Sequence, residues 1–513
     1  MLLGDNMKTI IVGGGISGLT AACFSNDLYK KRDVLLIEKN SKCGGLVNTF
    51  TRDGFRFEGG VRALLNSGII FPMLEKLNIE LETLPNKVSM GIEDKIIHIR
   101  DENSILDYEL MLKELYPENS NEISNLIKII KKTMDNLKIL YSVKNPLFAN
   151  TKDYINYLPW LFKAIKVFAA MKNLNEPIEE FLKKRISNNS LIDIIDQHFF
   201  KYIPSFFALS YFYIYSDYFY PKGGVGVLSE KLEQKFLENN GKILYNTEII
   251  SIDVNKKYVV DQNGEKYYYD KLIWAADLKN LYTMVYVNNN KFIEEKEKIL
   301  AAEPAESVYT VYVAVDEPPE TFSKISNGHF FYTPSKRGLG EIHKSELEKI
   351  IQNGKKEDII EWIEKFAKYN TYEISIPVLK DIDAAPKGKT GLIISTLFDY
   401  RLVKKLYNDG WYDEFKGYME KHFIETLSNI YPMLKDKIIF KFSATPLTIE
   451  NYADTYNGSI IGWSFKDKLP IVNSLSKSAL TSIPNVYKAG KWAYSPSGIP
   501  MAILTSKIAA DKI

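Results

Sequence analysis

The sequence predicts an α/β fold, and three observations carry this prediction. An apolar, β-branched run at residues 8–12 leads directly into a glycine-rich turn and then a helical stretch. A second β-branched run at 33–37 ends at an acidic residue, and near the C-terminus a strand at 486–488 runs into a glycine and a final helix. Strands that alternate with helices in this way are typical of a buried parallel sheet.

Composition sets the class of protein and excludes several functions. The 513 residues amount to roughly three domain equivalents, and 45% hydrophobic with 25% charged residues is the balance of a globular chain. With 66 basic and 64 acidic residues, the net charge of +2 gives no overall attraction for nucleic acid, so no such partner is expected. Two cysteines exclude a disulfide framework, and five histidines without paired spacing predict no metal site. Aromatic residues, 13% of the chain, indicate a large buried apolar surface or an apolar ligand.

The turn after the first strand fits a GxGxxG pattern at Gly13, Gly15 and Gly18. The first glycine of such a pattern makes a tight turn, the second lets a pyrophosphate approach the backbone, and the third allows close packing of helix on strand. Ile16 and Ser17 lie between the glycines, and a helix is expected over 20–29. The N–H groups at the helix N-terminus would face the phosphates.

An acidic residue stands at the end of the second strand. Glu38 lies 20 residues after Gly18, the spacing at which a carboxylate accepts hydrogen bonds from both hydroxyls of an adenosine ribose. Lys39 follows it and no arginine replaces it, which argues against a bound 2′-phosphate. The strand, turn, helix, strand and acid together predict a dinucleotide-binding domain.

Two further glycine segments follow along the chain. Each is a glycine pair with the residues after it: Gly44, Gly45 and Leu46, then Gly59, Gly60, Val61 and Arg62. They resemble the second and third signatures of FAD-containing oxidoreductases with a glutathione-reductase-like flavin domain. This resemblance implies FAD as the cofactor, because an NAD enzyme has no need of backbone surfaces for a more extended cofactor.

The far end of the chain carries a matching signal. A strand runs into Gly490, and Gly498, Ile499 and Pro500 introduce the last helix, expected over 501–510. This segment resembles the C-terminal flavin motif of the amine oxidase and phytoene desaturase superfamily, in which the helix N-terminus stabilises charge on the reduced ring. Lys491 departs from the motif, since many relatives hold the ribityl chain with an acid there. It would favour an anionic reduced flavin, and a solvent-exposed Lys491 is equally compatible.

Three internal segments resemble phytoene desaturases and carotenoid isomerases. They lie at 220–228, 384–389 and 444–463, so the resemblance covers nearly the whole chain. The first shows no strand before it and is interpreted as the turn by which the chain re-enters the flavin domain, not as a second nucleotide loop. Ile249 follows at a position where relatives pack an aliphatic side chain on the adenine.

The resemblance also implies a domain plan. A glutathione-reductase-like FAD-binding Rossmann domain would be built from discontinuous segments at 1–100, 221–290 and 441–513. A helical, aromatic-rich insert would occupy 101–220, and an α+β substrate domain with a mixed sheet would occupy 291–440. Strand-like runs at 307–315, 373–379 and 391–398 indicate that sheet.

The activity implied by the resemblance is an oxidoreductase acting on carbon–carbon bonds. It would desaturate, saturate or isomerise a lipophilic isoprenoid or polyene by hydride transfer with flavin N5. Arg62, Trp492 and Tyr494 are the candidate catalytic residues, although core packing is the simpler explanation of the two aromatic rings. His198 and Asp217, in the insert, offer acid–base groups. Without a second dinucleotide fingerprint, electrons would leave to an external acceptor such as oxygen or a quinone.

Two other functions fit the same pattern: a flavin amine or amino-acid oxidase, and a non-catalytic flavoprotein on a membrane surface. The stretch at 203–220 has about the length of a membrane span but contains Asp217 and is bounded by prolines. Residues 155–171 fit either a surface helix lying on a membrane or a helix packed over a substrate cavity. No signal peptide is evident, so a cytoplasmic protein is expected, and association with the cytoplasmic face of a membrane is left open.

Overall fold

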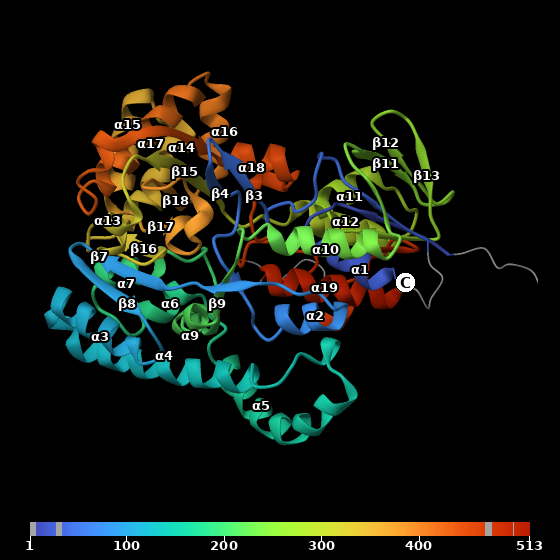
Figure 1. Cartoon of the computed structure of the whole chain (residues 1–513), viewed down its shortest axis with the longest axis horizontal. Helices are drawn as coiled ribbons and strands as arrows, with labels where there is room; N and C mark the ends of the chain where they lie inside the picture. The colour runs from blue at the N-terminus through green and yellow to red at the C-terminus, as the bar shows by residue number, and fades with distance from the viewer. Residues whose placement is uncertain (1–6, 27–32, 467–473, 496) are drawn as a thin grey trace, which may run out of the picture.

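The computed structural model of the chain describes residues 7–26, 33–466, 474–495 and 497–513. Figure 1 shows two lobes, one built on a parallel sheet and the other on a larger mixed sheet. Helices cover both sheets, and the helix α5 projects from the lower edge of the molecule.

The parallel sheet is assembled from both ends of the chain. Its strands are ordered β10 (Lys242–Leu244), β2 (Asp33–Ile37), β1 (Lys8–Val12), β14 (Lys271–Trp274) and β20 (Val486–Lys488). All neighbouring pairs are parallel. Because both faces of the sheet are covered, the residues of β1 and β2 are mostly apolar. The sequence therefore predicts both strands with their observed bounds. The predicted α/β fold with a Rossmann-like domain is confirmed.

Helices cover one face of this sheet and a ribbon covers the other. The first face carries α1 (Ile16–Ser25), α10 (Val227–Glu238) and α19 (Ile499–Lys512). The second carries the antiparallel ribbon β11 (Ile249–Asp253), β12 (Tyr258–Asp261) and β13 (Lys266–Tyr268), with α11 (Leu278–Met284) and α12 (Asn290–Ala301). Both helices begin earlier than expected. α1 starts at Ile16, directly after Gly15, and α19 starts at Ile499, directly after Gly498. The expected end of the first helix, at 27–29, lies outside the described residues.

The larger sheet has seven strands. Their order is β19 (Ile438–Ala444), β15 (Ser307–Val315), β18 (Thr390–Phe398), β17 (Tyr372–Ser375), β16 (His329–Thr333), β7 (Val88–Ile92) and β8 (Lys95–Ile99). Every pair is antiparallel except β16 with β7. The strand expected at 373–379 ends at Ser375, because Pro377 has no N–H to donate.

Helices build a large core on this sheet, and two of its strands come from the N-terminal segment. The core includes α14 (Ser345–Asn353), α15 (Lys356–Tyr369), α16 (Tyr400–Asn408) and α17 (Tyr412–Leu427), with the short α13 (Pro319–Ser323) beside them. β7 and β8 belong to the segment 1–100, so the expected boundary at residue 100 does not follow the strand pairing. A local pattern cannot show which sheet a hairpin joins.

The helical insert contains seven α-helices in its described residues. They are α3 (Ser104–Leu115), α4 (Ser120–Leu140), α5 (Tyr157–Lys172), α6 (Ile178–Lys183), α7 (Asn189–Asp196), α8 (Ser205–Ala208) and α9 (Tyr211–Ser216). Most of them share a core with β7 and β8. The stretch at 203–220 is divided between α8, α9 and β9 (Tyr218–Pro221). In the described part of the chain, no helix combines the length and apolarity needed to span a bilayer.

The segment at 220–228 corrects one expectation, because a strand does precede it. β9 pairs antiparallel with β5 (Leu64–Leu65) and β6 (Thr83–Pro85), which are distant in sequence and could not be recognised locally. Its glycines still form no nucleotide loop. A Cβ at Gly224 or Gly226 would meet Thr49 at 2.5 or 2.6 Å, so these glycines pack on the hairpin of β3 (Thr49–Arg52) and β4 (Phe55–Glu58).

His198 makes stability pH-dependent. Its ring lies against Phe199 and Phe331, and burial lowers its pKa from 6.5 to about 4. Between these two pKa values the unfolded chain binds a proton that the folded chain does not, so the free energy of unfolding falls by on the order of 3 kcal/mol as the pH drops through this window. In urea titrations from about pH 7 to about pH 4.5, His198→Phe should flatten this fall. A slope equal to that of the wild type would contradict the assignment.

Candidate cofactor and active site

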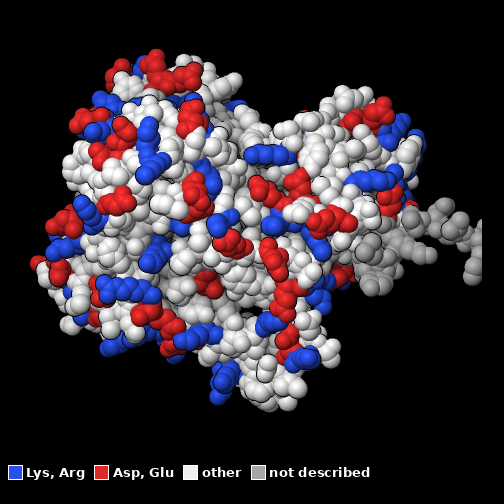
Figure 2. Space-filling view, in the orientation of Figure 1, with Lys and Arg blue, Asp and Glu red and all other residues white. Residues whose placement is uncertain are grey.

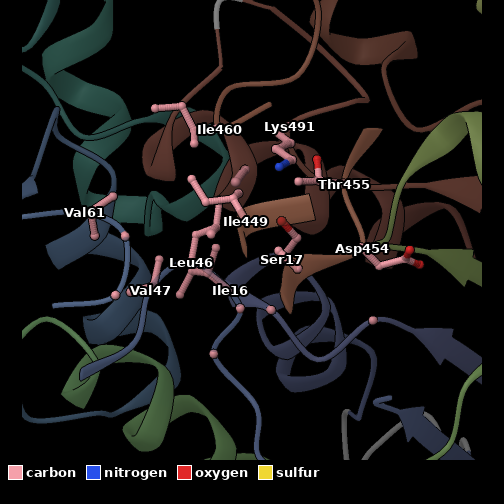
Figure 3. Close-up of a pocket in the computed structure, with 18 of the residues that line it drawn as sticks. Ile16, Ser17, Leu46, Val47, Val61, Ile449, Asp454, Thr455, Ile460 and Lys491 are labelled. Carbon is pink, nitrogen blue, oxygen red and sulfur yellow. The ribbon is translucent and has the colours of Figure 1, made fainter. Parts of the chain in front are cut away.

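A cavity of about 390 Å³ lies at the carboxyl ends of β1, β2 and β14 (Figure 3). Val12, Ile37 and Trp274 line it from these strands. The chain passes from β1 to β2 on one side and returns through β14 on the other, so the strand order reverses here. Open α/β sheets bind their ligands at such a reversal.

Backbone from three glycine segments forms one continuous wall of this cavity. The N–H of Gly44 donates to the carbonyl of Gly14 at 2.9 Å, and Gly15 and Gly44 form a parallel β-bridge. Farther along, the N–H of Val61 donates to the carbonyl of Leu46 at 3.3 Å. The segments at 13–15, 44–46 and 59–61 therefore lie in succession, as an extended ligand requires.

The glycines of this wall have different packing roles. A Cβ on Gly18 would lie 1.7 Å from the carbonyl oxygen of Gly13, so only glycine lets the helix approach the turn. A Cβ on Gly15 would meet no protein atom closer than 4.0 Å and would point into open space at the cavity. A Cβ on Gly490 would meet Ser17 Oγ at 2.8 Å, so the two ends of the chain are in contact.

Glu38 is held in place by two backbone donors. The N–H of Gly14 donates to Oε2 at 2.6 Å and the N–H of Asn40 to Oε1 at 2.8 Å. The side chain lies at the end of β2 and lines the cavity, as does the neighbouring Lys39. Each carboxylate oxygen keeps a free acceptor site, so Glu38 can also accept ribose hydroxyls.

Two helix N-termini reach the cavity. α1 contributes Ile16 and Ser17, and α19 contributes Ile499 after Gly498. No side chain caps either helix. Both therefore present unpaired N–H groups and a positive dipole end to a ligand, which favours an anion such as a diphosphate.

Lys491 lies in the cavity wall rather than in solvent. Its Nζ donates to the carbonyl of Ser459 at 2.6 Å, and Figure 3 shows the side chain among the lining residues. Burial lowers the pKa of Lys491 to about 8, against the opposing effect of Asp277. A cation thus stands where relatives of the motif place an acid.

The seven-stranded sheet contributes a polar wall around Arg62. The guanidinium donates to the carbonyl of Gly60 at 2.6 Å, to Ser395 Oγ at 2.7 Å and to Thr310 Oγ1 at 3.3 Å. Arg62 is only 4% exposed. Burial raises the pKa of nearby Glu58, and the charge of Arg62 opposes that rise.

The same wall holds a histidine–glutamate pair that the sequence did not reveal. His329 Nε2 donates to Glu373 Oε1 at 3.0 Å, and Asn86 Nδ2 donates to His329 Nδ1 at 3.3 Å. Burial lowers the pKa of His329, so the ring is neutral. Burial alone would raise the pKa of Glu373, but His329, Arg62 and Lys380 together hold it below its usual value. Glu373 is an ionised carboxylate at the cavity.

In the sequence, the one sign of this polar wall is that polar residues occur inside otherwise apolar strands. Thr310 in β15, His329 in β16, Glu373 in β17 and Ser395 in β18 all line the cavity. Buried polar side chains are informative because burial without a partner is costly. The sequence alone does not show that these strands converge.

Most residues expected from the sequence line the cavity: Gly13, Gly15, Ile16, Ser17, Glu38, Lys39, Gly44, Gly45, Leu46, Gly59, Gly60, Val61, Arg62, Ile249, Lys491, Trp492, Gly498 and Ile499. Four expected residues are not part of the lining: Gly18, Gly490, Tyr494 and Pro500. Tyr494 follows a turn in which the N–H of Ala493 donates to the carbonyl of Gly490 at 2.9 Å.

The acid–base candidates of the insert have structural surroundings instead. His198 lies among aromatic rings away from the cavity. Asp217 accepts a hydrogen bond from the N–H of Ser67 at 2.7 Å. Neither lines the cavity, whereas His329 and Glu373 do.

Unpaired polar atoms in the lining fit FAD. Arg62 Nε, Trp492 Nε1 and Ser497 Oγ are buried, line the cavity and have no hydrogen-bond partner among the described residues. Buried donors of this kind are normally paired. FAD would bring a diphosphate to the helix N-termini, a ribose to Glu38 and a ring system with several acceptors.

Comparisons with known proteins agree with this geometry. Residues 11–77 match the family model of an NAD(P)-binding Rossmann-like domain. An inactive all-trans-retinol 13,14-reductase from Danio rerio is 22% identical over 95% of this chain and 82% of its own length. Prolycopene isomerase 1, chloroplastic, from an Oncidium hybrid cultivar is 23% identical over 89% of this chain and 75% of its own length.

A solved structure extends the likeness to the whole fold. Putrescine oxidase bound to putrescine superposes with a TM-score of 0.61 at 11% identity, covering 99% of this chain and 98% of that one. The fold and the relatives support FAD as the cofactor. The resemblance first seen in the motifs is confirmed at the level of similarity: along most of its length the chain is similar to a retinol reductase, a prolycopene isomerase and a 4,4'-diapophytoene desaturase, and it has the fold of putrescine oxidase.

Proposed function

We propose that the protein is a FAD-dependent oxidoreductase that desaturates, saturates or isomerises carbon–carbon bonds of a lipophilic isoprenoid or polyene. The observation that carries this proposal is one continuous cavity. Its first part is lined by dinucleotide-type glycine turns, and its second by acid–base side chains of the seven-stranded sheet. The seven-stranded sheet and the helical insert would then form the substrate domain, and oxygen or a quinone would serve as the external electron acceptor.

The chain's own residues divide the chemistry between them. Bound FAD supplies a hydride acceptor or donor at N5. Arg62, fixed by its hydrogen bonds, would orient the polar end of a substrate that carries one, such as retinol. In desaturation, the ionised carboxylate of Glu373 takes up the proton from the carbon next to the hydride site; in saturation, Glu373 must first be protonated to deliver it. The N–H of His329 holds the carboxylate in position.

The direct test is anaerobic incubation of the holoprotein with phytoene, prolycopene and all-trans-retinol, once with oxidised flavin and once with flavin reduced by dithionite, because saturation consumes reduced flavin. Conversion of one of them, with loss of flavin absorbance near 450 nm for an oxidation, supports the proposal. An isomerisation would leave the absorbance unchanged and appear as a new geometric isomer on chromatography. Peroxide release from amines or amino acids, without conversion of a polyene, would instead identify an oxidase of those substrates. FAD-loaded protein inert toward both classes would favour the non-catalytic flavoprotein.

Glu373→Gln should lower turnover by about 10² or more, because the proton acceptor is lost. FAD content should stay unchanged. If the reaction is a desaturation, activity of the wild type should fall as the pH drops through the lowered pKa of Glu373, where the carboxylate becomes protonated, and the variant should lack this acidic limb.

Glu306→Gln is the matched control for this variant. Glu306 also lies beside a histidine, His343, at 3.7 Å, and its pKa is also below the usual value, but it does not line the cavity. Its removal should leave turnover within about twofold of the wild type. Equal losses in both variants would show that Glu373 acts only through the fold.

A further inference from the structure

Exposed apolar side chains are concentrated on one segment, α5 and the turn before it. Seven large apolar residues there are between 48% and 82% exposed: Tyr154, Ile155, Leu158, Leu161, Phe162, Ile165 and Phe168. Their spacing of three and four residues within α5 places them along one side of the helix. A contiguous apolar surface of this kind marks a site of contact with a partner or a membrane.

The helix projects from the body of the protein. Figure 1 shows α5 below α4, and Figure 2 shows the projection as a largely uncharged surface. Trp160 Nε1 donates to the carbonyl of Ile139 at 2.9 Å, and the hydroxyl of Tyr157 donates to the carbonyl of Lys144 at 2.7 Å. Ala164 and Val167 are its buried residues. One side of α5 is therefore anchored on the protein while the apolar side faces outward.

The position of α5 decides between the two readings of residues 155–171. A helix packed over the substrate cavity would contribute side chains to the cavity lining, but no residue of α5 does so. Its large apolar side chains face outward instead. The surface-helix interpretation is the one that the geometry supports.

Charge identifies the kind of surface that α5 would meet. Lys163, Lys166 and Lys172 are exposed, and the helix contains no acidic residue. None of the three lysines forms an ion pair with a carboxylate in the described part of the chain. At 100° per residue, Lys172 falls in line with the apolar side of the helix and Lys166 lies next to it. Lysines next to aromatic and aliphatic side chains are typical of helices that lie in the interface of an anionic bilayer.

We propose that α5 docks the protein on a bilayer containing anionic phospholipid, with Leu161, Phe162, Ile165 and Phe168 entering the acyl boundary and the lysines contacting headgroups. A water-insoluble substrate, as the proposed function requires, would be available at that surface. The docking itself depends on α5 and not on catalysis, so the two proposals fail separately.

Flotation of the FAD-loaded full chain with vesicles tests the proposal. Vesicles of phosphatidylcholine mixed with phosphatidylglycerol should carry the protein upward, and vesicles of phosphatidylcholine alone should carry less. The double variant Phe162→Ser/Phe168→Ser should weaken binding by about tenfold or more. Lys166→Gln/Lys172→Gln should remove most of the preference for phosphatidylglycerol, about fivefold for each lysine.

Tyr407→Ser is the matched control. Tyr407 is 57% exposed in α16, across the molecule from α5 in Figure 1, and its loss should not change flotation. FAD content and urea unfolding confirm that each variant is folded. Wild-type protein that stays with the buffer, or a Phe162→Ser/Phe168→Ser variant that floats like the wild type, would overturn the proposal. So would a dimer that dissociates in this variant without any vesicle binding, since the face would then pair two copies.

Discussion

Gly18→Ala is expected to abolish FAD binding and to lower the free energy of unfolding by about 3 kcal/mol or more. The new Cβ would lie 1.7 Å from the carbonyl oxygen of Gly13, an atom of the backbone that forms the turn. No side-chain rearrangement can relieve this overlap, so α1 must move away from β1. Urea unfolding of the FAD-free protein and fluorescence titration with FAD measure the two effects.

Gly15→Ala separates cofactor binding from stability in the same turn. Its Cβ would meet Gly45 Cα at 4.0 Å and nothing nearer, and its φ of −69° suits any residue. Stability should change by less than about 0.5 kcal/mol, whereas FAD affinity should fall by about tenfold or more, because the Cβ occupies the side of the turn where the diphosphate approaches. Equal stability losses in both variants, or full FAD affinity in Gly18→Ala, would refute this assignment of roles.

Arg62→Met should lower the free energy of unfolding by about 3 to 5 kcal/mol and reduce FAD affinity. The side chain is buried, and its loss would leave Thr310 and Ser395 without their shared donor and Glu58 with Lys380 as its remaining nearby positive charge. Arg62→Lys should recover only part of the loss, since an ammonium cannot reproduce the guanidinium fork. Urea unfolding measures all three proteins.

Arg52→Met is the control for Arg62. Arg52 is exposed, lies over the ring of Phe442 at 4.5 Å and does not line the cavity. Its loss should cost less than about 1 kcal/mol. A comparable cost for both arginines would mean that Arg62 is not the centre of the polar wall.

The cofactor side of the molecule could be predicted from the sequence because its signals are local. The turn at 13–18 needs glycines, and the sequence shows them directly. Glu38 follows at a spacing set by the length of one helix and one strand. The second and third glycine segments and the start of α19 are equally local. Each could be recognised without knowing the rest of the fold.

The acid–base wall could not be predicted in this way. His329 takes one partner, Asn86, from 243 residues earlier and another, Glu373, from 44 residues later. Their meeting depends on the strand order of the seven-stranded sheet and on the parallel pairing of β16 with β7. Strand order and register are set by the packing of whole faces, so His329 looks like any lone histidine in the sequence.

Hydrogen–deuterium exchange of the protein with and without FAD tests the central claim most directly. If the first glycine turn and the N-terminus of α19 bind one FAD molecule, added FAD should protect amides in 13–19 and in 498–505 together, at one equivalent and in step with a flavin absorbance near 450 nm. Protection of only one of these segments, or none at FAD concentrations that saturate related flavoproteins, would contradict the account.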